Sequence, residues 1–166
     1  RVRFLEEDEL PKLLTACENS SNKDLYLAVI LSLTTGGRQS EIMGLRWSQI
    51  DFKRRVAILG ETKNGDRRSI PLSGKVVPLL QERMKVRRIN DDRIFPPEEG
   101  ATKTPYVNLR KPWVKAMQEA EIEDFHWHDL RHTAASYLTM NNVSLVEIAK
   151  ILGHKTISMV LRYSHL

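Results

Sequence analysis

Apolar residues recur at the three- and four-residue spacing of an α-helix along most of this chain, and that periodicity constrains its fold more than any other feature. Clear examples are the stripe from Leu10 to Cys17 and the repeat of Leu130, Ala134 and Leu138. We expect further helices at Asp24 to Leu33, Arg38 to Gly44, Val76 to Met84, Leu109 to Met117 and Leu145 to Leu152. The chain is therefore predicted to fold as a mainly α-helical domain of the α+β class.

One section of the chain has the character of β-strands instead. Arg55 to Leu59 and Arg67 to Pro71 are strand-like, and Asn64-Gly65 lies between them. Asparagine and glycine both tolerate positive φ, which tight hairpin turns require. The pattern predicts a small antiparallel hairpin.

Several residues mark the expected ends of the helices. Ser144 and Glu147 have the spacing of a capping box, in which each side chain accepts a hydrogen bond from the other residue's backbone amide. Gly153 can end the same helix in the left-handed conformation, and Thr34 to Gly37 should end the second helix. Ser73 is the predicted N-cap of the helix that follows it.

The bulk composition fits a single domain. The 166 residues can bury one core, and Cys17, as the only cysteine, cannot form an intramolecular disulfide. We expect Cys17 to be a packing residue and the protein to work in a reducing cytoplasm. The longest apolar run, Leu25 to Leu33, is shorter than the roughly 20 residues of a membrane span and should be a buried helix. Because the chain opens at Arg1 rather than at a methionine, we expect a fragment of a longer protein.

The charge of the chain favours a polyanionic partner. Lys and Arg outnumber Asp and Glu by 26 to 21, which gives a formal net charge of +5. The basic residues are clumped at Lys53 to Arg55, Arg67-Arg68, Arg83 to Arg88 and Arg110-Lys111. A solvated basic face that only aids solubility is the alternative interpretation.

Scattered polar residues supply cations for phosphodiester chemistry without a metal ion. The planar guanidinium groups of Arg38 and Arg131 can bind phosphate oxygens two at a time and so neutralise the charge of a transition state. His128 lies one helical turn before Arg131, so we expect both on the same side of one helix. His154 should be exposed by the turn at Gly153 and able to hydrogen-bond the phosphate.

Tyr163 is the candidate nucleophile. Free tyrosine has a pKa near 10, so a base or a cationic field must help the phenol to react at neutral pH. His128 is the favoured base. Lys63, on the predicted hairpin, is expected to protonate the leaving sugar oxygen.

Each assignment has a structural alternative. Arg38 and Lys63 can be solvated surface residues, and a histidine after a helix end can merely complement the helix dipole. Tyr163 and Tyr137 can be core aromatics whose hydroxyls reach water. We interpret His126 and His132 as structural residues, with His132 bonding a buried backbone group. The histidines lack cysteine companions and suitable spacing, so neither a zinc site nor a cofactor is expected.

Taken in order, these motifs resemble those of the tyrosine recombinases of the phage integrase family. The resemblance rests on four blocks that span nearly the whole chain: Thr35 to Trp47, Thr62 to Pro71, His128 to Leu138 and Leu152 to Tyr163. Any one block is weak, but four in register are specific. By this resemblance the catalytic residues are Arg38, Lys63, His128, Arg131, His154 and Tyr163.

The resemblance implies a mainly helical fold with a small three-stranded antiparallel sheet, and DNA recombination or integration as the activity. Tyr163 would attack a scissile phosphate, leaving a 3′-phosphotyrosyl bond and a free 5′-hydroxyl, without ATP, cofactor or metal. The implied partner is double-stranded DNA, bound by a homotetramer on two duplexes in the bacterial nucleoid or in the cytoplasm of a phage host. Residues 1–166 would form one catalytic domain, without the family's N-terminal DNA-clamping domain and C-terminal tail, so we expect a fragment that is monomeric and binds DNA weakly.

Two other functions are compatible with parts of the pattern. A type IB topoisomerase shares the tyrosine and the phosphate clamp but relaxes supercoils, and the size and motifs of this chain disfavour it. A non-catalytic helix-turn-helix regulator would use Ser144 to Leu152, the turn at Gly153 and a second helix at Thr156 to Arg162. That alternative leaves Arg38 and His128 without a shared purpose.

Overall fold

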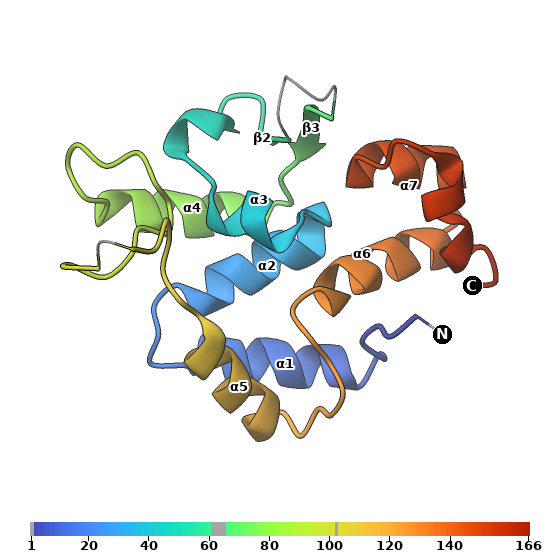
Figure 1. Ribbon diagram of the computed structural model, residues 1–166, viewed down its shortest axis with the longest axis horizontal. Coiled ribbons are helices and arrows are strands. Elements are labelled where there is room, and N and C mark those ends of the chain that lie inside the picture. Colours follow the sequence, from blue (N-terminus) through green and yellow to red (C-terminus); the bar gives the residue numbers. More distant parts are fainter. Residues whose placement is uncertain (1, 61–65, 102) are drawn as a thin grey trace.

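The computed structural model describes residues 2–60, 66–101 and 103–166. Helices are the main regular structure of the described chain, with a small sheet at one side (Figure 1). The α-helices are α1 (Glu9–Glu18), α2 (Leu25–Thr35), α3 (Gln39–Met43), α4 (Val76–Lys85), α5 (Arg110–Glu119), α6 (Asp129–Met140) and α7 (Leu145–Leu152). They confirm the helices predicted from periodicity and the mainly α-helical α+β class.

The sheet has three antiparallel strands in the order β1-β2-β3. These are β1 (Ile50–Asp51), β2 (Val56–Leu59) and β3 (Arg68–Pro71). Ala57 of β2 pairs with Ile50 on one side and with Ile70 on the other, and all three side chains are buried. Both predicted strands are thus confirmed, while the predicted reversal at Asn64-Gly65 lies outside the described residues.

Helix α2 lies at the centre of the fold, where it packs against α1, α4 and α6 (Figure 1). It is buried on nearly all sides, because its run of aliphatic residues leaves no polar face. It ends at Gly36, which adopts the left-handed conformation with φ 66°. A Cβ atom at Gly36 would lie 2.6 Å from the side chain of Leu152, so glycine lets the end of α2 approach α7 closely.

The buried apolar residues form a main core and a smaller, separate one. The main core includes α2, the sheet, Cys17 and the aromatic residues Trp113 and Trp127. The smaller one, here called the C-terminal cluster, is built from α6, α7 and the short 3₁₀ turn η4 (Leu161–Tyr163), together with Val160, which joins η4 to the preceding turn η3 (Ile157–Met159). Its buried members are Ala135, Ile148, Ala149, Leu152, Val160 and Tyr163.

The ends of α7 are as predicted. The Ser144 hydroxyl accepts a hydrogen bond from the Glu147 amide at 3.3 Å, and the Glu147 carboxylate accepts one from the Ser144 amide at 3.2 Å. Gly153 ends the helix with φ 68°. The capping box therefore fixes the start of α7, and the left-handed glycine turns the chain at its end.

One predicted detail of the helices is wrong, and one element that the helix-turn-helix alternative needs is not found. Ser73 is not the N-cap of α4, because Lys75 occupies that position and Ser73 contributes only its backbone carbonyl to a preceding turn. The second helix that a helix-turn-helix regulator would need at Thr156 to Arg162 is absent from the described residues, which form the turns η3 and η4 there. The turn η3 lies against α7 and η4 lies against α6, and Val160 and Tyr163 are the buried residues of this segment.

Candidate active site

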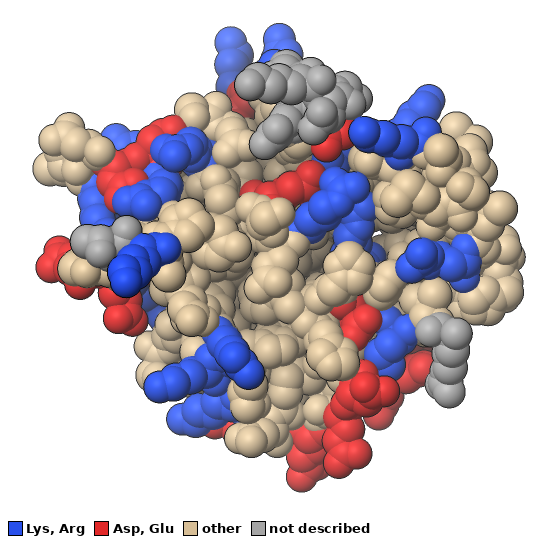
Figure 2. All heavy atoms as spheres, in the orientation of Figure 1, with Lys and Arg blue, Asp and Glu red and all other residues tan. Residues whose placement is uncertain are grey.

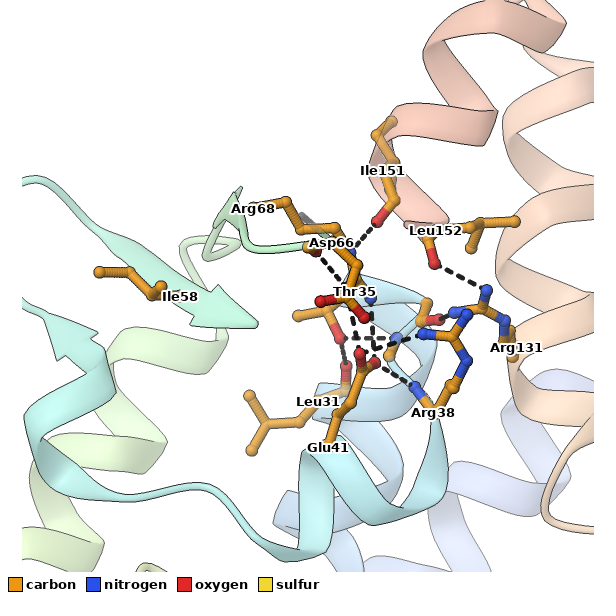
Figure 3. A network of polar contacts seen from close by, with 12 residues as sticks. Leu31, Thr35, Arg38, Glu41, Ile58, Asp66, Arg68, Arg131, Ile151 and Leu152 are labelled. Atoms are coloured by element: carbon orange, nitrogen blue, oxygen red, sulfur yellow. Dashed lines mark hydrogen bonds and ion pairs between the residues drawn. The ribbon is translucent and has the colours of Figure 1, made fainter. Parts of the chain in front are cut away.

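Arg131 lies at the centre of the predicted site and joins three helices. It belongs to the first turn of α6 and is 4% exposed. Its two Nη atoms donate hydrogen bonds to the carbonyl oxygens of Gly36 and Leu152, both at 2.7 Å (Figure 3). These carbonyls lie at the ends of α2 and α7, where the last turn of a helix leaves them without helical partners. Arg131 therefore fixes the two helix ends from which Arg38 and His154 follow.

The surroundings of Arg131 lower its pKa but leave it positively charged at pH 7. Burial, followed by the charge of Arg38, lowers the pKa of Arg131 to about 10. The guanidinium is still protonated at pH 7, because that pH lies well below its pKa. The site thus holds a permanent positive charge in a nearly dry position.

Arg38 begins α3 and has a more open position than Arg131. Its side chain is 38% exposed, and its Nη1 lies 3.2 Å from the Glu41 carboxylate. The other Glu41 oxygen accepts the backbone amide of Arg38 at 2.7 Å. Glu41 thus holds the guanidinium on one side, while the Arg38 side chain stays partly exposed.

Arg68 and Glu41 form a buried ion pair that sequence analysis missed (Figure 3). Arg68 Nη1 and Nη2 donate to the two Glu41 oxygens at 3.0 and 2.9 Å, and its Nε donates to the carbonyl of Ile151 at 2.7 Å. The pair therefore ties β3 to α3 and to the end of α7. Gly153 is required beside it, since a Cβ atom there would lie 2.7 Å from the Arg68 guanidinium.

Glu41 remains ionised in this buried position. Burial alone raises the pKa of its carboxyl, but hydrogen bonds from Arg68 and from the Arg38 amide, with the charges of both arginines, bring the pKa below its ordinary value of 4.5. The spacing of Arg38 and Glu41 suits a capping box, and that was the only local signal for this residue.

The two predicted histidines lie close to the arginines. His128 is the N-cap of α6 and is exposed, while His154 is half-buried rather than exposed as predicted. Loss of water around the rings, followed by the charge of Arg131, lowers the pKa of both, and that of His154 to about 4. Both imidazoles are therefore neutral at pH 7. Among the described residues, His154 Nδ1 is buried without a hydrogen-bond partner.

Tyr163 lies in the C-terminal cluster and is 2% exposed. Its hydroxyl is 2.6 Å from Nδ1 of His132, a residue that sequence analysis expected to bond a buried backbone group. That expectation was wrong, and the imidazole at the hydroxyl is not that of His128. The His128 ring instead meets the His132 ring edge to face, with centroids 4.8 Å apart. No local sequence signal pairs His132 with Tyr163, because 31 residues separate them.

Tyr137, the alternative core tyrosine, lies elsewhere. Its hydroxyl donates a 3.2 Å hydrogen bond to the carbonyl of Leu5. Lys63, the remaining predicted site residue, lies outside the described residues. A cavity of about 450 Å³ beside Arg38 and Glu41 is bounded by Gly60 and Asp66, the residues that flank positions 61–65.

A larger cavity, of about 1160 Å³, lies between α5 and the segment that precedes α6. Its lining is mostly apolar and includes Trp113, Met117 and Phe125. None of the five described residues predicted for the site lines it. The described residues predicted for the site therefore lie outside this larger cavity.

The described residues give little support for a metal site, a membrane-spanning helix or a reactive thiol. Within residues 2–60, 66–101 and 103–166, no group of three or more His, Cys, Asp and Glu residues is arranged to hold a metal ion. None of the helices described there combines the length and apolar character needed to cross a bilayer. Cys17 is buried as predicted, and burial raises the pKa of its thiol to about 12.

Comparison with known proteins connects this geometry to one group. Residues 3–166 match the group described as the Phage integrase family. The chain is 38% identical over 148 residues to the shufflon-specific DNA recombinase of Escherichia coli, covering 87% of the chain and 35% of that protein. It is 32% identical over 179 residues to the integrase of Salmonella phage P22, covering 100% of the chain and 44% of that integrase.

Solved structures show the same fold. The catalytic domain of bacteriophage HP1 integrase superposes with a TM-score of 0.79 at 32% identity, covering 99% of this chain and 88% of that one. XerH site-specific recombinase bound to its difH substrate, in a pre-cleavage complex, superposes with a TM-score of 0.82 at 20% identity, covering 100% of this chain and 51% of that one. The chain thus spans less than half the length of the shufflon-specific recombinase and of the phage P22 integrase.

Proposed function

The chain belongs to the phage integrase family, and from this premise we propose that it is the catalytic domain of a site-specific DNA recombinase that uses Tyr163 as its nucleophile. One observation carries the proposal. Arg131 binds the ends of α2 and α7 at once, and so brings Arg38 and His154 beside the helix that contacts Tyr163. Cations for a phosphate, neutral imidazoles and a phenol are thereby concentrated in one place.

The proposed reaction exchanges one phosphodiester bond for another. The Tyr163 oxygen attacks phosphorus and loses its proton, while the bond from phosphorus to the 5′ oxygen breaks and that oxygen gains a proton. The product is a 3′-phosphotyrosyl bond and a free 5′-hydroxyl. Attack by a 5′-hydroxyl of another strand reverses the step, so strands are rejoined without an external energy source.

The side chains divide these tasks by their chemistry. Arg38 and Arg131 neutralise the charge that builds on the non-bridging oxygens, because guanidinium groups are permanently charged and fork-shaped. His154, neutral at pH 7, donates a hydrogen bond to the phosphate. Lys63 protonates the leaving 5′ oxygen. His128 stands at the start of the same helix as Arg131 and is proposed to act on the same phosphate.

Double-stranded DNA is the proposed partner, with four copies assembled on two duplexes. Solved relatives of the same fold include complexes of the Tn1549 transposon integrase and of XerH recombinase with DNA. The chain's net charge of +5 suits a polyanion. Figure 2 shows Lys and Arg side chains over the sheet, α4, α5 and α7, with the main acidic group at the lower right of the view.

Covalent capture of DNA tests the nucleophile. A duplex nicked just beyond the cleavage site loses its short 5′-hydroxyl strand after attack, so the covalent product accumulates. We expect wild-type protein to form this adduct in EDTA, and Tyr163→Phe to form none because the attacking oxygen is missing. Tyr137→Phe is the matched control and should form the adduct, since its hydroxyl bonds Leu5 instead.

Two results would contradict the proposal. An adduct that persists in Tyr163→Phe would assign the nucleophile to another residue. Cleavage that requires magnesium and leaves no protein on the DNA would indicate a nuclease instead.

A further inference from the structure

The short contact between the Tyr163 hydroxyl and His132 Nδ1 is the feature of the site that the proposed roles leave unused. We infer that His132 accepts the phenol proton when Tyr163 attacks DNA, which makes it a catalytic residue in addition to those predicted from the sequence. The inference rests on the proposed function. It also replaces His128 as the favoured base.

Geometry is the first argument. The oxygen and nitrogen are 2.6 Å apart, at the short end for a hydrogen bond from a hydroxyl. His132 directly follows Arg131 on α6, so the base and the central phosphate-binding arginine share one helix. The His128 ring contacts the His132 ring rather than the phenol, so His132 lies between His128 and the phenol proton.

Packing holds this pair in place from both sides. Tyr163 is 2% exposed and lies among the apolar residues of the C-terminal cluster. Helix α6 is packed between α2 and α7, so the His132 backbone has little freedom to move. A hydrogen bond between two such side chains has a fixed geometry, which a proton transfer requires.

The protonation state of His132 is the second argument. The charged and titratable groups that face it are His128, Asp129, Arg162 and Arg131, together with the Tyr163 phenol. Burial, followed by the influence of His128, lowers the pKa of His132, so its ring is neutral at pH 7. A phenol has one proton to donate, and a neutral ring can accept it at Nδ1 while its own proton stays on Nε2.

The phenol itself needs a base. Burial raises the pKa of Tyr163, while the charges of Arg162 and Arg131 act in the opposite direction. The same two arginines stabilise negative charge on the oxygen as its proton leaves. In the step, the O–H bond breaks and the proton moves to Nδ1 while the oxygen–phosphorus bond forms. When a 5′-hydroxyl attacks the phosphotyrosine, His132 returns the proton to the phenol.

The experiment measures adduct formation on the nicked duplex from pH 5 to 9, with thermal unfolding of each variant to show that it is folded. His132→Gln can still accept a hydrogen bond from the phenol but cannot take its proton. We expect the rate to fall about 10²- to 10⁴-fold. His132→Ala should lose as much and regain part of the rate when imidazole is added. His126→Gln is the matched control and should keep the wild-type rate, because its side chain is 79% exposed.

The pH profile separates a base from a merely structural residue. The wild-type rate should be flat above the ordinary histidine pKa of 6.5 and fall at lower pH, where His132 becomes protonated. The His132→Gln rate should instead rise with pH across the range, because only ionisation of the phenol itself then supplies the nucleophile.

The outcomes distinguish the two proposals. A wild-type adduct with an unchanged rate in His132→Gln would overturn the role of His132 and leave the proposed function standing. A faster rate in His132→Gln would also overturn it, and would show that the contact stores the tyrosine in an inactive position. A wild-type protein that forms no adduct would overturn both.

Discussion

Arg38 and Arg131 have the same side chain, but their surroundings predict different effects of substitution. Arg131 is 4% exposed and satisfies two backbone carbonyls, whereas the Arg38 side chain is 38% exposed and bonds only to Glu41 among the described residues. An unsatisfied buried carbonyl costs about 1–3 kcal/mol. Substitution of Arg38 should therefore affect phosphate binding alone. Substitution of Arg131 should affect both phosphate binding and the stability of the fold.

We predict that Arg38→Ala and Arg131→Ala both slow adduct formation severely, while only Arg131→Ala strongly lowers the free energy of unfolding. Urea denaturation of the two variants, compared with their adduct rates, measures both effects. An Arg131→Ala protein as stable as Arg38→Ala would show that the carbonyls of Gly36 and Leu152 find other partners.

The Glu41–Arg68 pair should make stability depend on pH. The folded-state pKa of Glu41 is lowered, so its contribution is complete above the ordinary pKa of 4.5 and is lost as pH falls through the folded value. Glu41→Gln leaves Arg68 charged and largely buried, which should destabilise the fold near neutral pH by less than the roughly 3–5 kcal/mol typical of a fully buried pair. We expect the difference from wild type, measured by urea denaturation from pH 3 to 7, to shrink below pH 4.5. A difference that stays constant down to pH 3 would contradict this assignment.

Single residues also show where prediction from sequence stops. Arg38, His128 and Arg131 stand in recognisable motifs, and the structure brings them together. The partners that hold the site could not be found this way, because Glu41 and Arg68 are 27 residues apart and meet only in the folded chain. The same holds for His132, whose helical position predicts a buried side chain but not the phenol beside it.

At the scale of secondary structure, periodicity predicted the helices well, because each buries one apolar stripe against a neighbour. It was less successful where the chain is irregular. Serine is a common cap, yet Lys75 and not Ser73 is the N-cap of α4, and Thr156 to Arg162, which the helix-turn-helix alternative reads as its second helix, forms short turns. Short turns of this kind are decided by packing onto neighbouring elements, which local sequence does not record.

The turn after α7 provides a test at this scale. Gly153→Ala places a Cβ atom on a left-handed residue, at a cost of about 1–2 kcal/mol, and 2.7 Å from the Arg68 guanidinium. We expect lower stability and a slower adduct rate, because the Glu41–Arg68 pair and His154 are both displaced. Gly74→Ala is the matched control, since a Cβ atom there meets nothing within 4 Å. Equal thermal unfolding of the two variants would show that the turn adapts without disturbing the site.

For the whole molecule, charge is the property that sequence predicted most directly. Binding of a basic surface to DNA releases counterions, so affinity falls steeply as salt rises. Tyr163→Phe allows binding to be measured without covalent capture. We expect its DNA affinity, measured by fluorescence anisotropy, to fall as salt rises. A plot of the logarithm of affinity against the logarithm of salt concentration should be linear, with a slope of about −0.9 for each phosphate contacted. An affinity independent of salt would show that the basic clumps do not contact the backbone.

The separation of the C-terminal cluster from the main core has a consequence for how the domain works. Small cores at the edge of a protein open more easily than the centre, so backbone amides of α7 should exchange with solvent by local opening, while those of α2 exchange only on global unfolding. Tyr163, the proposed nucleophile, thus lies in the part of the described structure that opens most easily. Opening there would separate Tyr163 from His132 and the Leu152 carbonyl from Arg131, so the proposed chemistry belongs to the closed state and local opening suspends it.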